Sequence, residues 1–249
     1  MDKIRLGRTG LNVARCGFGA LPIQRIGREE AGHILRKAFD NGINFFDTAR
    51  MYSDSENKIG HALADVREDI LIATKTAASD RKALFGQLES SLQSLKTDYI
   101  DVYQLHNPES LPNPEEPEGL YQALLEAKNK GMIRFIGISS HRLTVALEAA
   151  ASKLYDTVQF PLSSISSDED IKLIDICKRN DVGLIAMKAL AGGLIGLLDI
   201  GYGLGLGHLQ EYPFSWHARA NSWQRLKKTV TNFRCAGNEK MGCGKRNSE

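Results

Sequence analysis

The feature that most constrains the fold is an alternation of short apolar runs with amphipathic stretches, which begins near residue 13 and continues to about residue 188. The runs are rich in Ile, Val and Phe and are mostly apolar on both faces, as is typical of parallel strands that are buried on two sides. They begin near residues 13, 43, 69, 101, 135, 157 and 182, and read VARCGF, INFFDT, DILIAT, DVYQLH, FIGIS, TVQFP and GLIAMK.

The stretches between these runs have the period and the end signals of helices. Residues 29–40 precede Asn41-Gly42, a common helix stop, and Ser53 with Glu56 predicts a capping box at the start of a helix over 54–64. Leucines at 84, 88, 92 and 95 share one helical face, and Asp168 or a neighbouring Ser opens a later helix.

Strands that alternate with helices in this way indicate βα units and a parallel sheet. Seven such units without a dinucleotide-binding glycine fingerprint favour a barrel over an open sheet, and 249 residues suffice for one. Residues 4–13 predict a hairpin ahead of the first barrel strand, with its turn at GRTG. The predicted fold is therefore α/β, a (β/α)8 TIM barrel.

The eighth βα unit of that barrel is not evident in the sequence. The best candidate for its strand is TVTNF, residues 229–233, in a segment without steady periodicity. We therefore predict a barrel over residues 1–193 and a divergent or truncated segment over 194–249, which belongs to the same domain if it is ordered.

Composition excludes several classes of protein. A net charge of +2 argues against a general nucleic-acid surface, and the polar start MDKIRLGRTG shows no secretion signal. The stretch 189–209 approaches membrane-span length but contains Asp199 and seven glycines, which argues against a span. The four cysteines include no CxxC pair, so no metal site is expected. A cytoplasmic location follows as the default, and the oligomeric state stays unknown.

Four residues with complementary acid–base chemistry lie at or just after the ends of three consecutive strands. They are Asp47, Tyr52, Lys75 and His106. The active site of a βα barrel lies at the carboxyl ends of its strands, so these side chains should meet there. A cation beside Tyr52 would lower the pKa of its phenol from about 10, a carboxylate would hold that cation, and His106 could orient a carbonyl. Proton donation to a carbonyl during hydride transfer fits this set.

The chain resembles the aldo-keto reductases through FFDTARMYSDSENKIGHAL, IATKT, SLQSLKTDYIDVYQLHNP and KGMIRFIGISSH, with similarity from residue 4 to about 193. The resemblance implies a TIM barrel, NADPH as hydride donor with NAD(H) not excluded, and a small carbonyl substrate. It implies that the catalytic tetrad is Asp47, Tyr52, Lys75 and His106. It also implies that the cofactor lies against Asp47 and Gly19, Ala20, Ser139, Ser140, Gln159, Met187 and Lys188.

Two departures from the family pattern weaken the cofactor half of this prediction. Ser140 stands where an Asn is common, and Ala189 replaces a usual proline. Nothing in residues 194–249 matches the family's eighth strand and the basic region that selects NADP. A catalytically impaired or regulatory relative with weak or no cofactor binding therefore stays open beside the reductase. A metal-dependent hydrolase that uses His106 and Asp47 lacks a second strand-end histidine.

Overall fold

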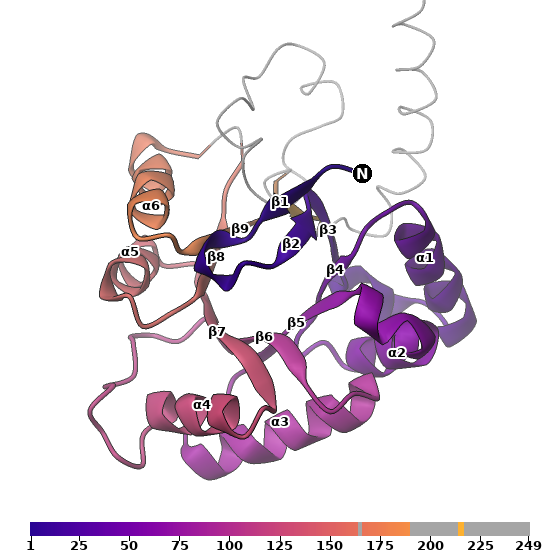
Figure 1. Cartoon of the computed structure of the whole chain (residues 1–249), viewed down its shortest axis with the longest axis horizontal. Coiled ribbons are helices and arrows are strands. Elements are labelled where there is room, and N and C mark those ends of the chain that lie inside the picture. Colours follow the sequence, from indigo (N-terminus) through magenta and orange to yellow (C-terminus); the bar gives the residue numbers. More distant parts are fainter. Residues whose placement is uncertain (164–165, 190–213, 217–249) are drawn as a thin grey trace, which may run out of the picture.

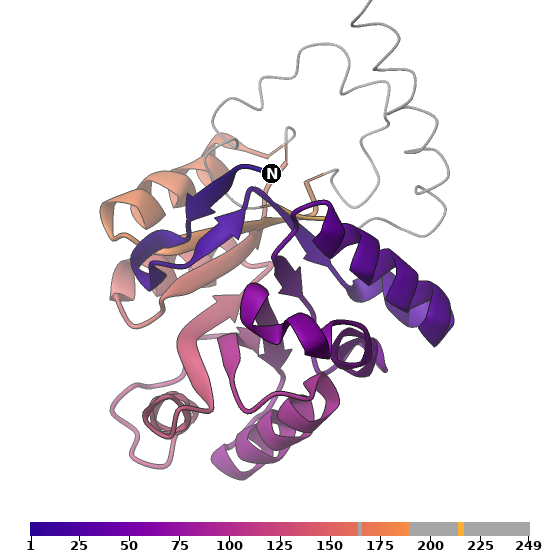
Figure 2. The ribbon, with the colours of Figure 1, turned by 45° about the vertical axis from the view of Figure 1, so that its right-hand side comes forward.

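The computed structural model describes residues 1–163, 166–189 and 214–216, and within them parallel strands alternate with helices as predicted. The helices lie outside the strands, as Figures 1 and 2 show from two directions. The strands of the predicted runs are β3 (Cys16–Gly19), β4 (Phe45–Asp47), β5 (Leu71–Thr76), β6 (Ile100–His106), β7 (Ile133–Ser139), β8 (Thr157–Pro161) and β9 (Gly183–Met187). The helices are α1 (Arg28–Asp40), α2 (Ser55–Leu63), α3 (Arg81–Leu95), α4 (Leu120–Asn129), α5 (Leu143–Ser152) and α6 (Asp168–Arg179).

The barrel is closed by a strand that the sequence did not reveal. Strand β10 (Phe214–Trp216) pairs in parallel with both β3 and β9, so the strands form a closed ring. The expectation that no eighth strand is evident is therefore corrected. A run of three residues is too short to show a period, whereas its two neighbours define its place in the sheet. The alternative candidate, residues 229–233, lies outside the described residues, and the boundary at residue 193 stays a prediction.

The predicted hairpin covers the amino-terminal end of the barrel. It consists of β1 (Lys3–Arg5) and β2 (Asn12–Ala14), which pair antiparallel, with the short 3-10 helix η1 (Gly7–Thr9) in the turn. Its apolar side chains pack against the inward-facing residues of four strands, in one cluster of Leu6, Leu11, Val13, Phe45, Ala73, Val102 and Ile185. Because this end is filled with apolar side chains, only the carboxyl end of the barrel interior is left for polar groups.

The hairpin approaches β9 so closely that Gly7 leaves no room for a side chain. A Cβ atom on Gly7 would lie 2.2 Å from the backbone nitrogen of Gly183, whereas one on Gly10 would meet nothing within 4 Å. Both glycines have positive φ angles, +49° and +68°, so alanine is strained at either position. Only at Gly7 is a backbone clash added to that strain.

We expect Gly7→Ala to lower the free energy of unfolding by about 2–4 kcal/mol, against about 1 kcal/mol for the matched control Gly10→Ala. Urea denaturation followed by circular dichroism measures both values. Equal losses for the two variants would show that backbone strain alone matters and that the hairpin can move away from β9.

Helix starts follow the predicted chemistry at some helices but not at all. The Oγ of Ser167 caps α6 in a capping box with Asp170, and Asp80 caps α3 by accepting from the backbone N–H of Ala83. The capping box predicted for Ser53 and Glu56 is wrong. Helix α2 has Asp54 at its N-cap with no side-chain capping bond, and Ser53 has a φ of 41° outside the helix.

Candidate active site

Polar side chains form a layer inside the barrel at its carboxyl end. This layer lies next to the apolar layer that the hairpin covers at the amino-terminal end. In a strand, residues two positions apart point to the same face. Val102 and Ala73 belong to the inner apolar cluster, so Gln104 and Lys75, two positions further on, also point inward. Asp47 ends β4, Ser139 ends β7, and Gln159 is paired in register with Ser139 from the middle of β8. With these residues, the alternation gives an inner polar layer of Asp47, Lys75, Gln104, His106, Ser139 and Gln159.

The central contact of this layer is a buried ion pair. The Nζ of Lys75 donates to Oδ1 of Asp47 at 2.7 Å and to the backbone oxygen of Thr48 at 2.6 Å. Asp47 is fully buried and Lys75 is only 1% exposed. Burial lowers the pKa of Lys75, and the negative charge of Asp47 opposes that shift. The predicted pairing of these two residues is thus present in the structure.

Two amide side chains complete the surroundings of the Asp47 carboxylate. Gln159 donates from Nε2 to Oδ2 of Asp47 at 3.1 Å, and Gln104 donates from Nε2 to Oε1 of Gln159 at 3.0 Å. The sequence analysis did not single out Gln104. Its position two residues before His106 on one strand is the pattern that could have found it. Gly137 makes room for it, because a Cβ there would lie 2.8 Å from Cγ of Gln104.

Tyr52 and His106 stand side by side next to the ion pair. Their ring centroids are 5.8 Å apart with an interplanar angle of 82°, an edge-to-face arrangement. The Nζ of Lys75 lies 5.4 Å from the centroid of the Tyr52 ring. The structure therefore brings together all four residues of the predicted acid–base set.

The pKa of Tyr52 shifts in the direction opposite to the sequence-based expectation. Burial raises this pKa above its ordinary value of 10.0, and the charge of Asp47 raises it further. Lys75, which the sequence analysis expected to lower this pKa, is paired with Asp47. The phenol of Tyr52 therefore stays protonated at neutral pH, which is the form that can donate a proton.

The loop that carries Tyr52 is held by backbone hydrogen bonds to the neighbouring strand and to itself. The N–H of Arg50 donates to the oxygen of Lys75 at 3.0 Å, and the N–H of Tyr52 donates to the oxygen of Ala49 at 2.9 Å. Glu56 is buried and accepts from Arg50 Nη1 and Thr74 Oγ1, both at 2.6 Å. Glu56 thus fixes this loop through side-chain contacts with β5 rather than through a helix cap.

The residues predicted to hold a nicotinamide lie on β7 and β8, next to the ion pair. Ser139 is paired in register with both His106 and Gln159, and its Oγ donates to the backbone oxygen of Leu105 at 3.3 Å. The Oγ of Ser140 is engaged in a local turn, where it donates to the oxygen of Arg142 and accepts from its N–H. Their contact with a cofactor stays a prediction.

The remaining predicted cofactor residues flank the position of β10. Gly19 ends β3, and the N–H of Ala20 donates to the backbone oxygen of Asp47 at 2.8 Å. Met187 ends β9 and is buried, while Lys188 follows with a φ of 57° and places Nζ 3.4 Å from Nδ1 of His141. Burial lowers the pKa of Lys188.

Asn107 is a further rim residue that the sequence analysis passed over. It follows His106 directly with a φ of 53°, and its Oδ1 accepts from the backbone N–H of His141 at 2.9 Å. Ser53 after Tyr52 and Lys188 after Met187 have positive φ angles too. A left-handed residue thus follows three of the predicted site residues, a placement that turns the chain sharply at the rim.

Two properties of the described residues bear on other classes of site. Among these residues, no group of three or more His, Cys, Asp or Glu side chains could bind a metal ion. In the same part of the chain, no helix has the length and apolar content that crossing a membrane requires. The apolar stretch at 189–209 lies outside the described residues except for Ala189.

A closed parallel barrel with a buried Asp–Lys pair, a protonated tyrosine and a histidine at its carboxyl end defines a (β/α)8-barrel protein with an acid–base site. The sequence model of the aldo/keto reductase family matches residues 15–198. The chain is 31% identical over 211 residues to the "uncharacterized oxidoreductase YqkF" of Bacillus subtilis, with 78% of this chain and 67% of that protein covered.

A second relative in Bacillus subtilis, "aldo-keto reductase YhdN", is 29% identical over 214 residues, with 78% of this chain and 64% of that protein covered. A solved structure of an aldo-keto reductase from Klebsiella pneumoniae in complex with NADPH superposes with a TM-score of 0.67 at 25% identity, covering 77% of this chain and 69% of that one. The chain thus spans about two thirds of the length of these relatives. It belongs to the aldo/keto reductase family.

Proposed function

We propose that the protein reduces an aldehyde or ketone to an alcohol with NADPH as the reductant and Tyr52 as the proton donor. The observation that carries this proposal is the buried Lys75–Asp47 pair at 2.7 Å beside the edge-to-face Tyr52 and His106 rings. The similar chain from Klebsiella pneumoniae, which is described as a complex with NADPH, supports the choice of cofactor.

The polar layer offers groups that suit a nicotinamide. The Oε1 of Gln104 is buried and has no hydrogen-bond partner among the described residues, and the Ser139 hydroxyl lies on the neighbouring strand β7. An acceptor and a hydroxyl of this kind fit the N–H and oxygen of a carboxamide. When bound, the reduced nicotinamide supplies the hydride.

Each residue of the tetrad has a role in placing one proton on the substrate oxygen. His106 orients the carbonyl oxygen toward the Tyr52 hydroxyl, and Tyr52 gives its proton to that oxygen as the carbon receives the hydride. Lys75 stabilises the phenolate that remains, and Asp47 holds Lys75 in place. The products are an alcohol and the oxidised cofactor, and a proton from water restores Tyr52.

An intact tetrad favours this reductase over a catalytically impaired relative, because an impaired relative has no need to keep a buried ion pair beside a protonated tyrosine. A small carbonyl substrate and a cytoplasmic location stay predictions.

Cofactor binding followed by turnover tests the proposal. We expect NADPH fluorescence to change with a Kd below about 1 mM, and NADPH absorbance to fall when small aldehydes are added. A parallel titration with NADH measures the preference between the cofactors. No fluorescence change up to about 1 mM of either cofactor would overturn the proposal for this chain.

A further inference from the structure

Lys58 is a buried lysine for which the proposed chemistry has no use. It lies in α2, six residues after Tyr52, and is only 3% exposed. Its Nζ donates three hydrogen bonds, to the backbone oxygens of Ile23 at 3.0 Å and Ile26 at 2.8 Å, and to Oδ1 of Asp54 at 2.7 Å. All three protons of the ammonium group are thus used.

The two carbonyls belong to the loop that follows β3. This loop runs from Ala20 through the 3-10 helix η2 (Leu21–Arg25) to Ile26. Two further side chains, one in the first turn of α2 and one just before the helix, reach the same loop. Ser55 Oγ donates to the oxygen of Ala20 at 3.0 Å, and Ser53 Oγ donates to Oε1 of Gln24 at 3.3 Å. Residues 53–58 therefore hold residues 20–26 at several points.

The same two segments carry predicted site residues at their ends. The loop begins at Ala20, directly after Gly19 at the end of β3, and α2 begins directly after the turn that carries Tyr52. Any movement between the loop and α2 would therefore change the space between the end of β3 and the Tyr52 hydroxyl.

Burial of a charged amine is costly unless each donor is paired, so a lysine is an unfavourable choice for filling space here. Backbone carbonyls are acceptors that no mutation of the loop can remove. A lysine on α2 can therefore hold a loop of any sequence at a fixed distance. Asp54 is largely exposed, with 56% of its side chain accessible, so the carbonyls are the better-shielded partners.

We propose that Lys58 is a positioning residue that holds the 20–26 loop against α2 and thereby fixes one wall of the carbonyl pocket beside Tyr52. The inference rests on the proposed reductase function. Lys58 itself does not contact the reacting atoms, and it acts through the backbone of Ile23 and Ile26.

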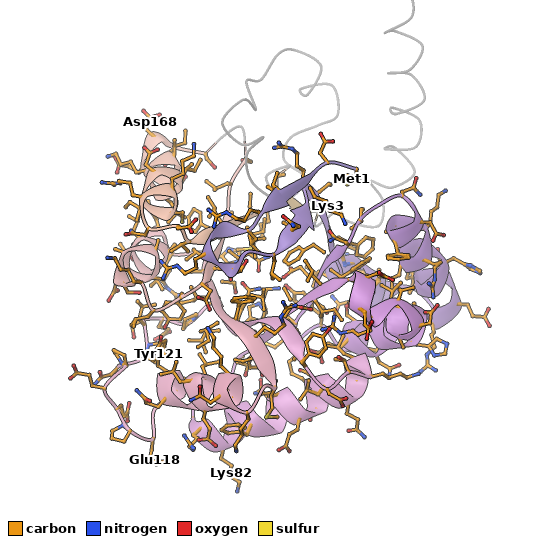
Figure 3. The ribbon with its side chains drawn as sticks, viewed as in Figure 1. Met1, Lys3, Lys82, Glu118, Tyr121 and Asp168 are labelled. Carbon is orange, nitrogen blue, oxygen red and sulfur yellow. The ribbon has the colours of Figure 1, made fainter. Side chains whose placement is uncertain are left out.

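The test compares Lys58→Met, which keeps the aliphatic stem, with Lys82→Met as the matched control. Lys82 points outward from α3, away from the barrel (Figure 3). Hydrogen–deuterium exchange in the absence of ligand should speed up about tenfold in peptides that cover residues 20–27, and should stay unchanged over α3. The control should leave both regions unchanged.

Kinetics give the second measurement. In Lys58→Met we expect the KM for the carbonyl to rise about tenfold, with kcat within about threefold of the unmodified chain, because the pocket wall moves but the tetrad stays in place. Asp54→Asn retains both carbonyl contacts, so it should change KM by less than about twofold. A conservative Lys58→Arg keeps donors for the carbonyls and should recover part of the loss.

Results that would overturn the role of Lys58 can be told apart from a failure of the proposed reductase function. Unchanged exchange over 20–27, an increase spread evenly over the whole chain, or faster loop exchange with an unchanged KM would each overturn the proposal. An effect of Asp54→Asn as large as that of Lys58→Met would also overturn it, because the ion pair and not the carbonyls would then hold the loop. If the unmodified chain reduces no carbonyl, the proposed function fails, and the exchange experiment alone decides whether Lys58 holds the loop.

Discussion

Replacing Tyr52 with phenylalanine should lower kcat for carbonyl reduction by about 10²–10⁴-fold and leave the Kd for NADPH within about threefold. The substitution removes the hydroxyl that we propose gives a proton to the substrate oxygen. The ring itself remains, so its edge-to-face contact with His106 at 5.8 Å is kept and the pocket should retain its shape. Steady-state kinetics and NADPH fluorescence measure the two quantities on the same preparation.

Tyr99→Phe is the matched control for that variant. Tyr99 lies at the amino-terminal end of β6, where its ring stacks under the guanidinium of Arg67 at 4.1 Å, a contact that phenylalanine keeps. Its turnover should equal that of the unmodified chain. A Tyr52→Phe variant that retains the normal rate would refute the assignment of Tyr52 as proton donor, and the proton would have to come from another group.

Replacing Lys75 with methionine should lower the free energy of unfolding by about 3–5 kcal/mol and abolish measurable turnover. The loss of stability arises because Asp47, which is fully buried, would lose the cation that offsets the cost of burying a carboxylate. The amides of Gln159 and Gln104, at 3.1 and 3.4 Å, would remain, but they carry no charge to offset its burial. Urea denaturation measures the change.

A double variant tests whether stability falls because Asp47 loses its cation or because the packing of the Lys75 side chain is lost. Asp47→Asn combined with Lys75→Met removes both charges at nearly constant volume, so it should recover part of the stability while turnover stays lost. Lys82→Met on the outer surface should change stability by less than about 0.5 kcal/mol. A Lys75→Met variant as stable as the unmodified chain would show that the ion pair makes no net contribution to stability.

The placement of the predicted acid–base residues follows largely from local patterns. Asp47, Lys75 and His106 stand at or next to the ends of apolar runs, and parallel strands bring their carboxyl ends to one rim. Short runs that are apolar on both faces mark such strands without reference to the rest of the chain. The fold class and the meeting of these residues could therefore be predicted.

Local sequence patterns did not predict contacts between residues that lie far apart in the sequence. Ser53 and Glu56 have the spacing of a capping box, but Glu56 instead accepts from Thr74, 18 positions away. Strand β10 has only three residues, and its place depends on neighbours at both ends of the barrel sequence, β3 and β9. Gln104 joins the Asp47 network through Gln159, 55 positions further along.

The sequence by itself thus determined the barrel class and the strand ends at which four side chains meet, because strand periodicity and strand ends are properties of neighbouring residues. Only the tertiary structure decided which charges pair and how deeply they are buried. The pKa of Tyr52 illustrates the difference. A neighbouring cation alone would lower it, but burial of the phenol and the negative charge of Asp47 raise it instead. Desolvation and long-range pairing depend on the packed barrel, so no single stretch of sequence encodes them.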